Sequence, residues 1–122
     1  MSIYKARSGL IFDDRFDTFD SSRWVVSPSE KHSHADGTLS LLHSDLEETN
    51  ALFEFPSDED VIAFEVKADY TPTELGDEGG LLVWKSAMEK LEFLESMDTT
   101  TQSNYSYWRV VKRNNLFTFF AY

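Results

Sequence analysis

The sequence predicts an all-β protein with antiparallel sheets packed as a sandwich, and three observations support this fold class. Apolar and polar residues alternate in several short segments. Turn-forming residues recur about every ten positions, as expected for many short strands in a sandwich or barrel. Aromatic residues make up 15% of the chain and include ten phenylalanines, and these side chains favour strands.

The strongest strand signal covers residues 60–70. Apolar side chains occupy every second position from Ile62 to Tyr70, and the charged residues Glu65, Lys67 and Asp69 fall between them. Successive side chains of a strand point to opposite faces, so this period of two indicates a strand that is buried on one side.

Four weaker segments complete the predicted strands, at residues 38–42, 51–55, 105–112 and 116–122. The first follows the turn dipeptide Asp36-Gly37, and Pro56 ends the second. The last two are separated by Asn114-Asn115, which suits a hairpin turn because asparagine tolerates a positive φ.

One segment supports two interpretations. Ser86 and Glu89 have the spacing of a helix capping box, and Ala87, Leu91 and Leu94 follow at helical spacing. The alternative is a hairpin in which residues 80–85 pair with residues 90–95. We prefer the hairpin because the flanking segments are strands and neighbouring strands usually pair.

Composition and charge exclude several classes of function. The 122 residues suit one domain over residues 1–122, which would bury about two-thirds of its surface without help from disulfides. The net charge of −11 opposes binding to nucleic acids and to anionic membranes. The absence of cysteine excludes thiol chemistry and cysteine metal sites. Residues 1–14 contain no stretch apolar enough for a signal peptide, so we expect a cytoplasmic protein, or a virion component if it is phage-encoded.

Four stretches in a fixed order carry a family resemblance: an acidic and aromatic opening at 10–24, Asp36-Gly-Thr-Leu-Ser-Leu41, Gly79-Gly-Leu-Leu-Val-Trp84 and Tyr107-Trp-Arg-Val-Val-Lys112. This succession resembles the concanavalin A-like lectin/glucanase superfamily, in particular its small DUF1349-like jelly-roll proteins. The resemblance implies a jelly-roll sandwich with one concave sheet that often carries the ligand groove.

Domains of that family are usually longer, and this sequence stops within a predicted strand. We therefore expect a jelly roll that is incomplete at its C-terminus. Either the chain is the N-terminal part of a longer domain, or the sandwich is completed by self-association or by a partner strand near Tyr122.

Catalysis is the less favoured function. Glycoside hydrolases, which belong to the same superfamily, need two carboxyl groups facing one groove. The resemblance implies a Glu-x-Asp-x-Glu strand for this purpose, and the sequence has none. The alternative of a glycoside hydrolase-like enzyme acting on a polysaccharide would require Glu92 to converge with Glu65 or Glu95.

Carbohydrate binding is the favoured ligand function, because flat aromatic rings pack on the C–H faces of sugars while polar neighbours bond to the hydroxyls. The candidate ligand-binding residues are Trp84, Glu92, Tyr107, Trp108 and Arg109. Tyr107 and Trp108 must point to opposite faces of one strand, so at most one of them lines a groove. Trp24 is expected in the core.

Metal binding has two candidates, although no cofactor is otherwise expected. Asp13, Asp14 and Asp17, with Asp20 nearby, offer the oxygen ligands that calcium prefers. His32, His34 and Asp36 share one side of an extended chain and offer zinc ligands, but they fall in what reads as a polar loop.

The sequence thus predicts a non-catalytic module that binds carbohydrate or serves a structural role in an assembly. A phage or prophage virion component is one concrete form of this hypothesis.

Overall fold

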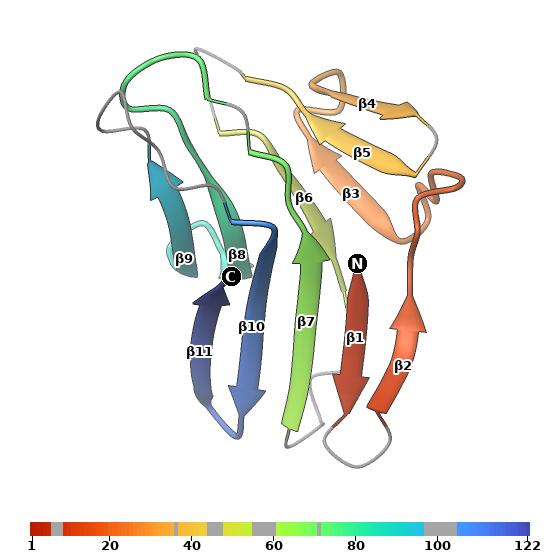
Figure 1. Ribbon diagram of the computed structural model, residues 1–122, viewed down its shortest axis with the longest axis vertical. Coiled ribbons are helices and arrows are strands. Elements are labelled where there is room, and N and C mark those ends of the chain that lie inside the picture. The colour runs from red at the N-terminus through yellow and green to blue at the C-terminus, as the bar shows by residue number, and fades with distance from the viewer. Residues whose placement is uncertain (6–8, 36, 44–47, 55–60, 71, 97–104) are drawn as a thin grey trace. The chain divides into compact units, whose positions relative to one another are not determined.

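The computed structural model describes residues 1–5, 9–35, 37–43, 48–54, 61–70, 72–96 and 105–122. Over these ranges the chain forms antiparallel strands and no helix (Figure 1), which confirms the all-β prediction. Nothing in this part of the chain is therefore a helix that could span a membrane. The chain divides into two compact units, Met1–Asp13 with Glu59–Tyr122 and Asp14–Asp58, and each is described by itself. That the whole chain is one domain stays a prediction.

The first unit is built on a five-stranded sheet with the order β11-β10-β7-β1-β2 (Figure 1). Its strands are β1 (Ser2–Lys5), β2 (Gly9–Asp13), β7 (Val61–Lys67), β10 (Tyr107–Arg113) and β11 (Leu116–Ala121). The central strand β7 is the segment with the clearest alternation, and it pairs with β10 on one side and with β1 on the other.

One face of this sheet forms the core of the unit. Ile3, Ile62 and Val110 lie on it and are only 3%, 2% and 8% exposed. The register places Ile3 and Val110 both opposite Phe64, so these apolar side chains gather around the middle of β7. The predicted apolar side of residues 62–66 thus faces the core, and Ala63 on the opposite side is also buried, at 6% exposed.

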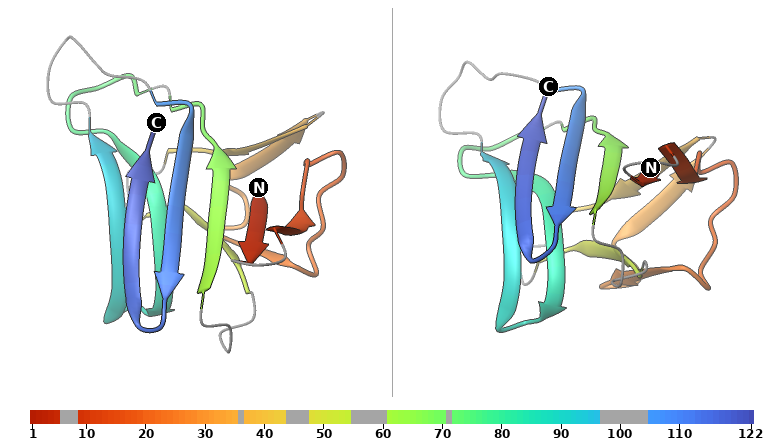
Figure 2. Two further views of the ribbon diagram at one scale, coloured as in Figure 1. Left: turned by 60° about the horizontal axis from the view of Figure 1, so that its bottom comes forward. Right: turned by 90° about the horizontal axis from the view of Figure 1, so that it is seen from below.

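A hairpin of β8 (Glu78–Ser86) and β9 (Glu89–Ser96) packs against this core face, at the end of the sheet formed by β10 and β11 (Figure 2). Phe93 of β9 contacts Phe119 of β11 with ring centroids 5.4 Å apart. Trp108 of β10 donates its indole N–H to Glu95 Oε1 at 2.7 Å. The unit therefore has two β layers, as a sandwich requires.

The hairpin at 78–96 decides between the two interpretations of this segment. Ser86 and Glu89 do interact, because Ser86 Oγ accepts the Glu89 N–H at 3.1 Å, but they do so across a tight turn between strands. The helix alternative is wrong and the hairpin is confirmed. The predicted turn at Asn114-Asn115 is also confirmed, with Asn114 at a φ of 54°.

The second unit consists of two antiparallel pairs. β3 (Trp24–Ser27) pairs with β6 (Asn50–Phe53), and β4 (His32–Ala35) pairs with β5 (Thr38–Leu41). Trp24 is 7% exposed and packs between Phe16 and Phe53, with ring centroids at 5.6 Å and 5.1 Å. The expectation that Trp24 belongs to a core is confirmed.

The stretch His32–Ala35 corrects one expectation. It was expected in a polar loop because it contains no apolar alternation, yet it forms β4 and pairs residue by residue with β5. Phe19 compensates for the missing apolar side chains, since its ring lies 5.0 Å from the ring of His32 and 6.3 Å from that of His34. Asp36, the third predicted zinc ligand, lies outside the described residues.

Candidate functional site

The predicted ligand-binding residues lie on three different surfaces of the first unit. Tyr107 and Arg109 share one face of the five-stranded sheet, because they are two positions apart on β10. Trp108 lies on the other face, which the hairpin covers. Trp84 and Glu92 lie on the outer side of the hairpin. The five residues therefore do not form one site.

Trp108 is the inward-pointing member of the pair Tyr107 and Trp108. Its indole nitrogen bonds to Glu95, and its ring lies 6.4 Å from that of Tyr70. Gly79 allows this packing, since a Cβ at that position would come within 2.9 Å of the Tyr70 ring. Trp108 thus joins the two layers and is not presented to a ligand.

Arg109 is the centre of the most organised group of side chains. Its Nη1 donates to Glu65 Oε2 at 3.0 Å, and its guanidinium carbon lies 5.4 Å from the ring centre of Tyr4. The sheet register places these partners, because Glu65 is directly opposite Arg109 on the neighbouring strand. The side chains of Glu65 and Arg109 are 16% and 31% exposed, so the ion pair is largely shielded from water.

Tyr122 extends this group beyond the end of β11. Its hydroxyl donates to Glu65 Oε2, and its ring stacks on Tyr107 with centroids 5.4 Å apart and planes at 20°. Backbone bonds between Tyr107 and Tyr122, of 2.8 Å and 3.0 Å, hold the two residues together. The hydrogen bond to the Glu65 carboxylate raises the pKa of Tyr122 above its ordinary value of 10.0.

We call this surface the tyrosine face, defined by Tyr4, Glu65, Tyr107, Arg109, Phe120 and Tyr122. Phe120 belongs to it because it lies directly opposite Arg109 on β11. Phe120 and Tyr122 are 45% and 55% exposed. The tyrosine face thus combines accessible flat rings with an arginine and a glutamate whose positions are fixed by bonds to each other.

The outer side of the β8–β9 hairpin is a second, smaller group. Trp84 is 40% exposed. Lys90 lies 5.8 Å from the centre of its ring and also forms an ion pair with Glu92 at 2.9 Å. Trp84 and Glu92 are therefore neighbours on one surface, and Lys90 contacts both of them.

The three glutamates considered for catalysis lie on different surfaces. Glu65 is on the tyrosine face, Glu92 is on the outer side of the hairpin, and Glu95 is between the layers, bonded to Trp108. Hydrolysis of a glycosidic bond requires two carboxyl groups on either side of one substrate atom. Neither Glu65 nor Glu95 meets Glu92 in this way.

The acids predicted to bind calcium form hydrogen bonds within the chain. Asp13 Oδ1 accepts the Ser2 hydroxyl at 2.7 Å. Asp14 accepts the backbone N–H of Phe16 at 2.8 Å and the indole N–H of Trp24 at 2.9 Å. Asp17 is exposed. Asp13 belongs to the first unit, whereas Asp14 and Asp17 belong to the second.

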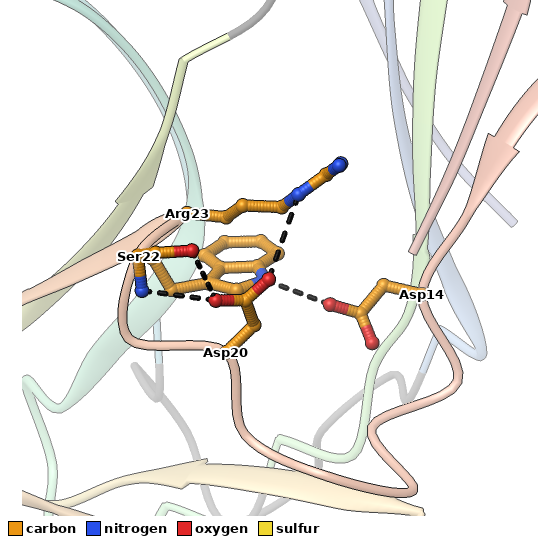
Figure 3. Close-up of polar contacts among 5 residues, drawn as sticks. Asp14, Asp20, Ser22 and Arg23 are labelled. Carbon is orange, nitrogen blue, oxygen red and sulfur yellow. Dashed lines mark hydrogen bonds and ion pairs between the residues drawn. The ribbon is translucent and has the colours of Figure 1, made fainter.

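Asp20 closes a turn in the same region (Figure 3). It accepts the backbone N–H and the hydroxyl of Ser22, and it lies 3.5 Å from the Arg23 guanidinium. The Ser22 hydroxyl bond, together with the other contacts, lowers the pKa of Asp20 below 3.8. The carboxylates of Asp14 and Asp20 therefore organise the start of the second unit.

Candidate metal clusters are absent from the described part of the chain, where no group of three or more histidine, aspartate or glutamate side chains is placed to hold an ion. The ring nitrogens of His32 and His34 face backbone carbonyls of Ser29 and Phe16, each at 2.5 Å. Each histidine therefore points one nitrogen at its own chain.

Four residues of the tyrosine face were not among the predicted ligand-binding residues: Tyr4, Phe120 and Tyr122, and Glu65, which was considered only for the enzyme alternative. Glu65 and Arg109 are 44 positions apart, and only the pairing of β7 with β10 brings them together. The alternation around residue 65 does show that Glu65 opposes the apolar face of its strand. That signal locates the correct face but does not identify its partner.

Comparisons with protein-family models, with curated proteins and with solved structures find no match for this chain.

Proposed function

We propose that this chain is a non-catalytic carbohydrate-binding module of lectin-like fold, and that the tyrosine face is its binding surface. The observation that carries the proposal is the Arg109–Glu65 ion pair, which is fixed among exposed aromatic rings on one face of a sheet. The resemblance of the sequence to the concanavalin A-like superfamily supports the same function.

The chemistry of the tyrosine face suits a sugar. Aromatic side chains offer large, rigid, apolar surfaces that lose little entropy when a ligand packs on them. Sugar hydroxyls need donors and acceptors at fixed positions, and Arg109 and Glu65 supply both kinds. Because these two groups are already held by each other and by Tyr122, little further ordering is needed when a ligand binds.

The placement of the acids supports binding without catalysis. The glutamates weighed for hydrolysis lie on separate surfaces, and Glu65 is bonded to an arginine and a tyrosine. We therefore favour recognition of a saccharide over its cleavage.

The test is a glycan array followed by isothermal titration calorimetry of the glycans it selects. Phe120→Ala, which removes an exposed ring of the tyrosine face, is expected to weaken binding at least about fivefold, since aromatic contacts are worth about 1 kcal/mol or more. Trp84→Ala, which removes an exposed ring of the hairpin, is the matched control and is expected to bind normally. Loss of binding in Trp84→Ala alone, or no glycan bound by the parent protein, would refute the proposal.

An assembly role is the second candidate, and the edge strand β11 favours it. The strand forms one edge of the five-stranded sheet and contains no charge, proline or glycine. The opposite edge, β2, has a bulge in its pairing and ends on Asp13, which are common protections against further strand addition. The unprotected edge is suited to pairing with a second copy of the chain.

The sequence of β11 is compatible with antiparallel pairing to itself. Centring the pair on Thr118 places Leu116 of one copy opposite Phe120 of the other and keeps matching faces together. Thr118→Lys is then expected to abolish a dimer seen by light scattering, whereas Thr38→Lys on β5 leaves it intact. A parent protein that stays monomeric at high concentration would exclude this role.

A further inference from the structure

The side of the five-stranded sheet that carries the tyrosine face has a charge of opposite sign to that of the whole chain. The chain has 22 acidic residues and 11 lysines and arginines. Among the described strands of the five-stranded sheet, the register places three cations on this side, Lys67, Arg109 and Arg113, and two carboxylates, Glu65 and Asp13. An excess of cations on one face of so acidic a chain is a local feature that a ligand can detect.

Of the two carboxylates on this side, Glu65 is paired with Arg109, whereas Asp13 lies on the edge strand β2 and its bond with the neutral Ser2 hydroxyl does not cancel its charge. Glu65 accepts from Arg109 and from the Tyr122 hydroxyl, and Asp13 accepts from the Ser2 hydroxyl. Lys67 and Arg113 are both exposed and form no ion pair with other described residues. On β7, β10 and β11, the charges on this side that are not paired with each other are therefore positive.

These two cations lie at opposite ends of the paired strands β7 and β10. Lys67 is directly opposite Tyr107, and Arg113 is six residues farther along β10. At about 3.4 Å per residue, the backbone positions of Lys67 and Arg113 are about 20 Å apart along the strands. The Tyr107–Tyr122 stack lies level with Lys67 across the strands, and the Arg109–Glu65 pair lies two residues farther along β10.

We infer that the ligand of the tyrosine face is a linear acidic polysaccharide with carboxylate groups, lying along β10. This inference rests on the proposed function and adds the charge class of the saccharide. The sugar rings pack on Tyr107, Tyr122 and Phe120, while carboxylates of the polymer meet Lys67 and Arg113. Hydrogen bonds from lysine and arginine to carboxylates are stronger than those between neutral groups. A nucleic acid would bring the same charge per residue, so the choice of a polysaccharide rests on the proposed function, and single-stranded DNA is the competing outcome of the test.

The experiment is calorimetric titration of the full chain with polygalacturonate and with fully methyl-esterified polygalacturonate, which has the same sugar backbone without its charge. Alginate and hyaluronate extend the acidic set, and single-stranded DNA tests for a general polyanion site. We expect at least one acidic polymer to bind, and the methyl ester to bind at least about tenfold more weakly than polygalacturonate if polygalacturonate is the one bound.

Two variants locate the charge effect. The double variant Lys67→Gln/Arg113→Gln is expected to lose about tenfold in affinity for the acidic polymer, as two exposed charge contacts of up to about 1 kcal/mol each would give. Lys85→Gln, which removes one exposed cation on the hairpin, is expected to leave affinity unchanged. Both variants alter exposed side chains, and a matching thermal unfolding curve shows that each is folded.

Two results would overturn the inference and leave the proposed function intact: binding of neutral glycans in preference to every acidic polymer, or unchanged affinity in the double variant. Tighter binding of single-stranded DNA than of any saccharide would overturn both. Failure to bind any saccharide, neutral or acidic, would remove the proposed function itself.

Discussion

The coupling between Arg109 and Glu65 can be measured, because truncation of either side chain removes the ion pair. The perturbation is a double-mutant cycle of Arg109→Ala, Glu65→Ala and the combined variant. Arg109→Ala alone also removes the contact with Tyr4, which is 5.4 Å from the guanidinium carbon, and Glu65→Ala alone removes the Tyr122 bond. The cycle cancels these separate losses and leaves the pairwise energy.

The expected coupling energy follows from distance and burial. Two unit charges about 4 Å apart attract by about 4 kcal/mol at an effective dielectric constant of 20, before the cost of desolvation is subtracted. Fully exposed pairs contribute about 0.2–1 kcal/mol, whereas breaking a buried pair costs about 3–5 kcal/mol. Side-chain exposures of 16% and 31% lie between these cases, so we expect a coupling of about 1–2 kcal/mol.

The assay is urea denaturation of the four proteins, followed by tryptophan fluorescence, with the free energies of unfolding compared at equal m-values. A coupling below about 0.3 kcal/mol would refute the reasoning, because the guanidinium would then not be fixed by Glu65. Tyr122→Phe introduced into the Glu65→Ala variant serves as a control. It is expected to leave the free energy of unfolding unchanged, since the Tyr122 hydroxyl then has no Glu65 carboxylate to bond.

Three further predictions concern stability and ionisation. Ile62→Ala should lower the free energy of unfolding by about 2–5 kcal/mol in chemical denaturation, because Ile62 is 2% exposed at the centre of the sheet; a loss below about 1 kcal/mol would contradict its core position. Gly80→Ala should lower the free energy of unfolding by at least about 3 kcal/mol, since the added Cβ would meet the Phe93 carbonyl oxygen at 1.9 Å. An unchanged melting temperature would be incompatible with the hairpin register. The raised pKa of Tyr122 means that the stabilising bond to Glu65 is complete below pH 10.0 and is lost as the pH rises through the folded-state pKa. Ultraviolet titration of Glu65→Gln should show the Tyr122 ionisation moving down towards pH 10.0. An unmoved titration curve would exclude the bond.

Much of the fold was predictable because the strands of the first unit alternate. The side of residues 62–66 that the pattern marks as apolar faces the core, and Asn114 forms the turn that its tolerance of positive φ predicts. Prediction failed for β4, where two histidines replace apolar residues and a phenylalanine from outside the strand packs on them. A period-two signal cannot detect a strand whose apolar contacts come from elsewhere in the chain.

The candidate site was less predictable than the fold. Tyr107 and Arg109 were predicted because flat rings and hydrogen-bonding side chains suit a sugar, but residue type does not show which faces of separate strands meet. Trp84 and Glu92 were grouped with them in the prediction but lie on the β8–β9 hairpin, away from the tyrosine face. The partners Tyr4 and Glu65 come from strands more than 40 residues away from β10, and strand order rather than local sequence places them there.

The most direct test of the tyrosine face as a binding surface is fluorine NMR of the chain labelled with fluorotyrosine, titrated with the saccharide that calorimetry selects. The chain has five tyrosines, and Tyr→Phe variants assign each resonance. We predict that the resonances of Tyr107 and Tyr122 move with saturation at the calorimetric affinity, while that of Tyr70, which packs against Trp108, stays in place. Unmoved Tyr107 and Tyr122 resonances in the presence of bound saccharide would show that the sugar binds elsewhere.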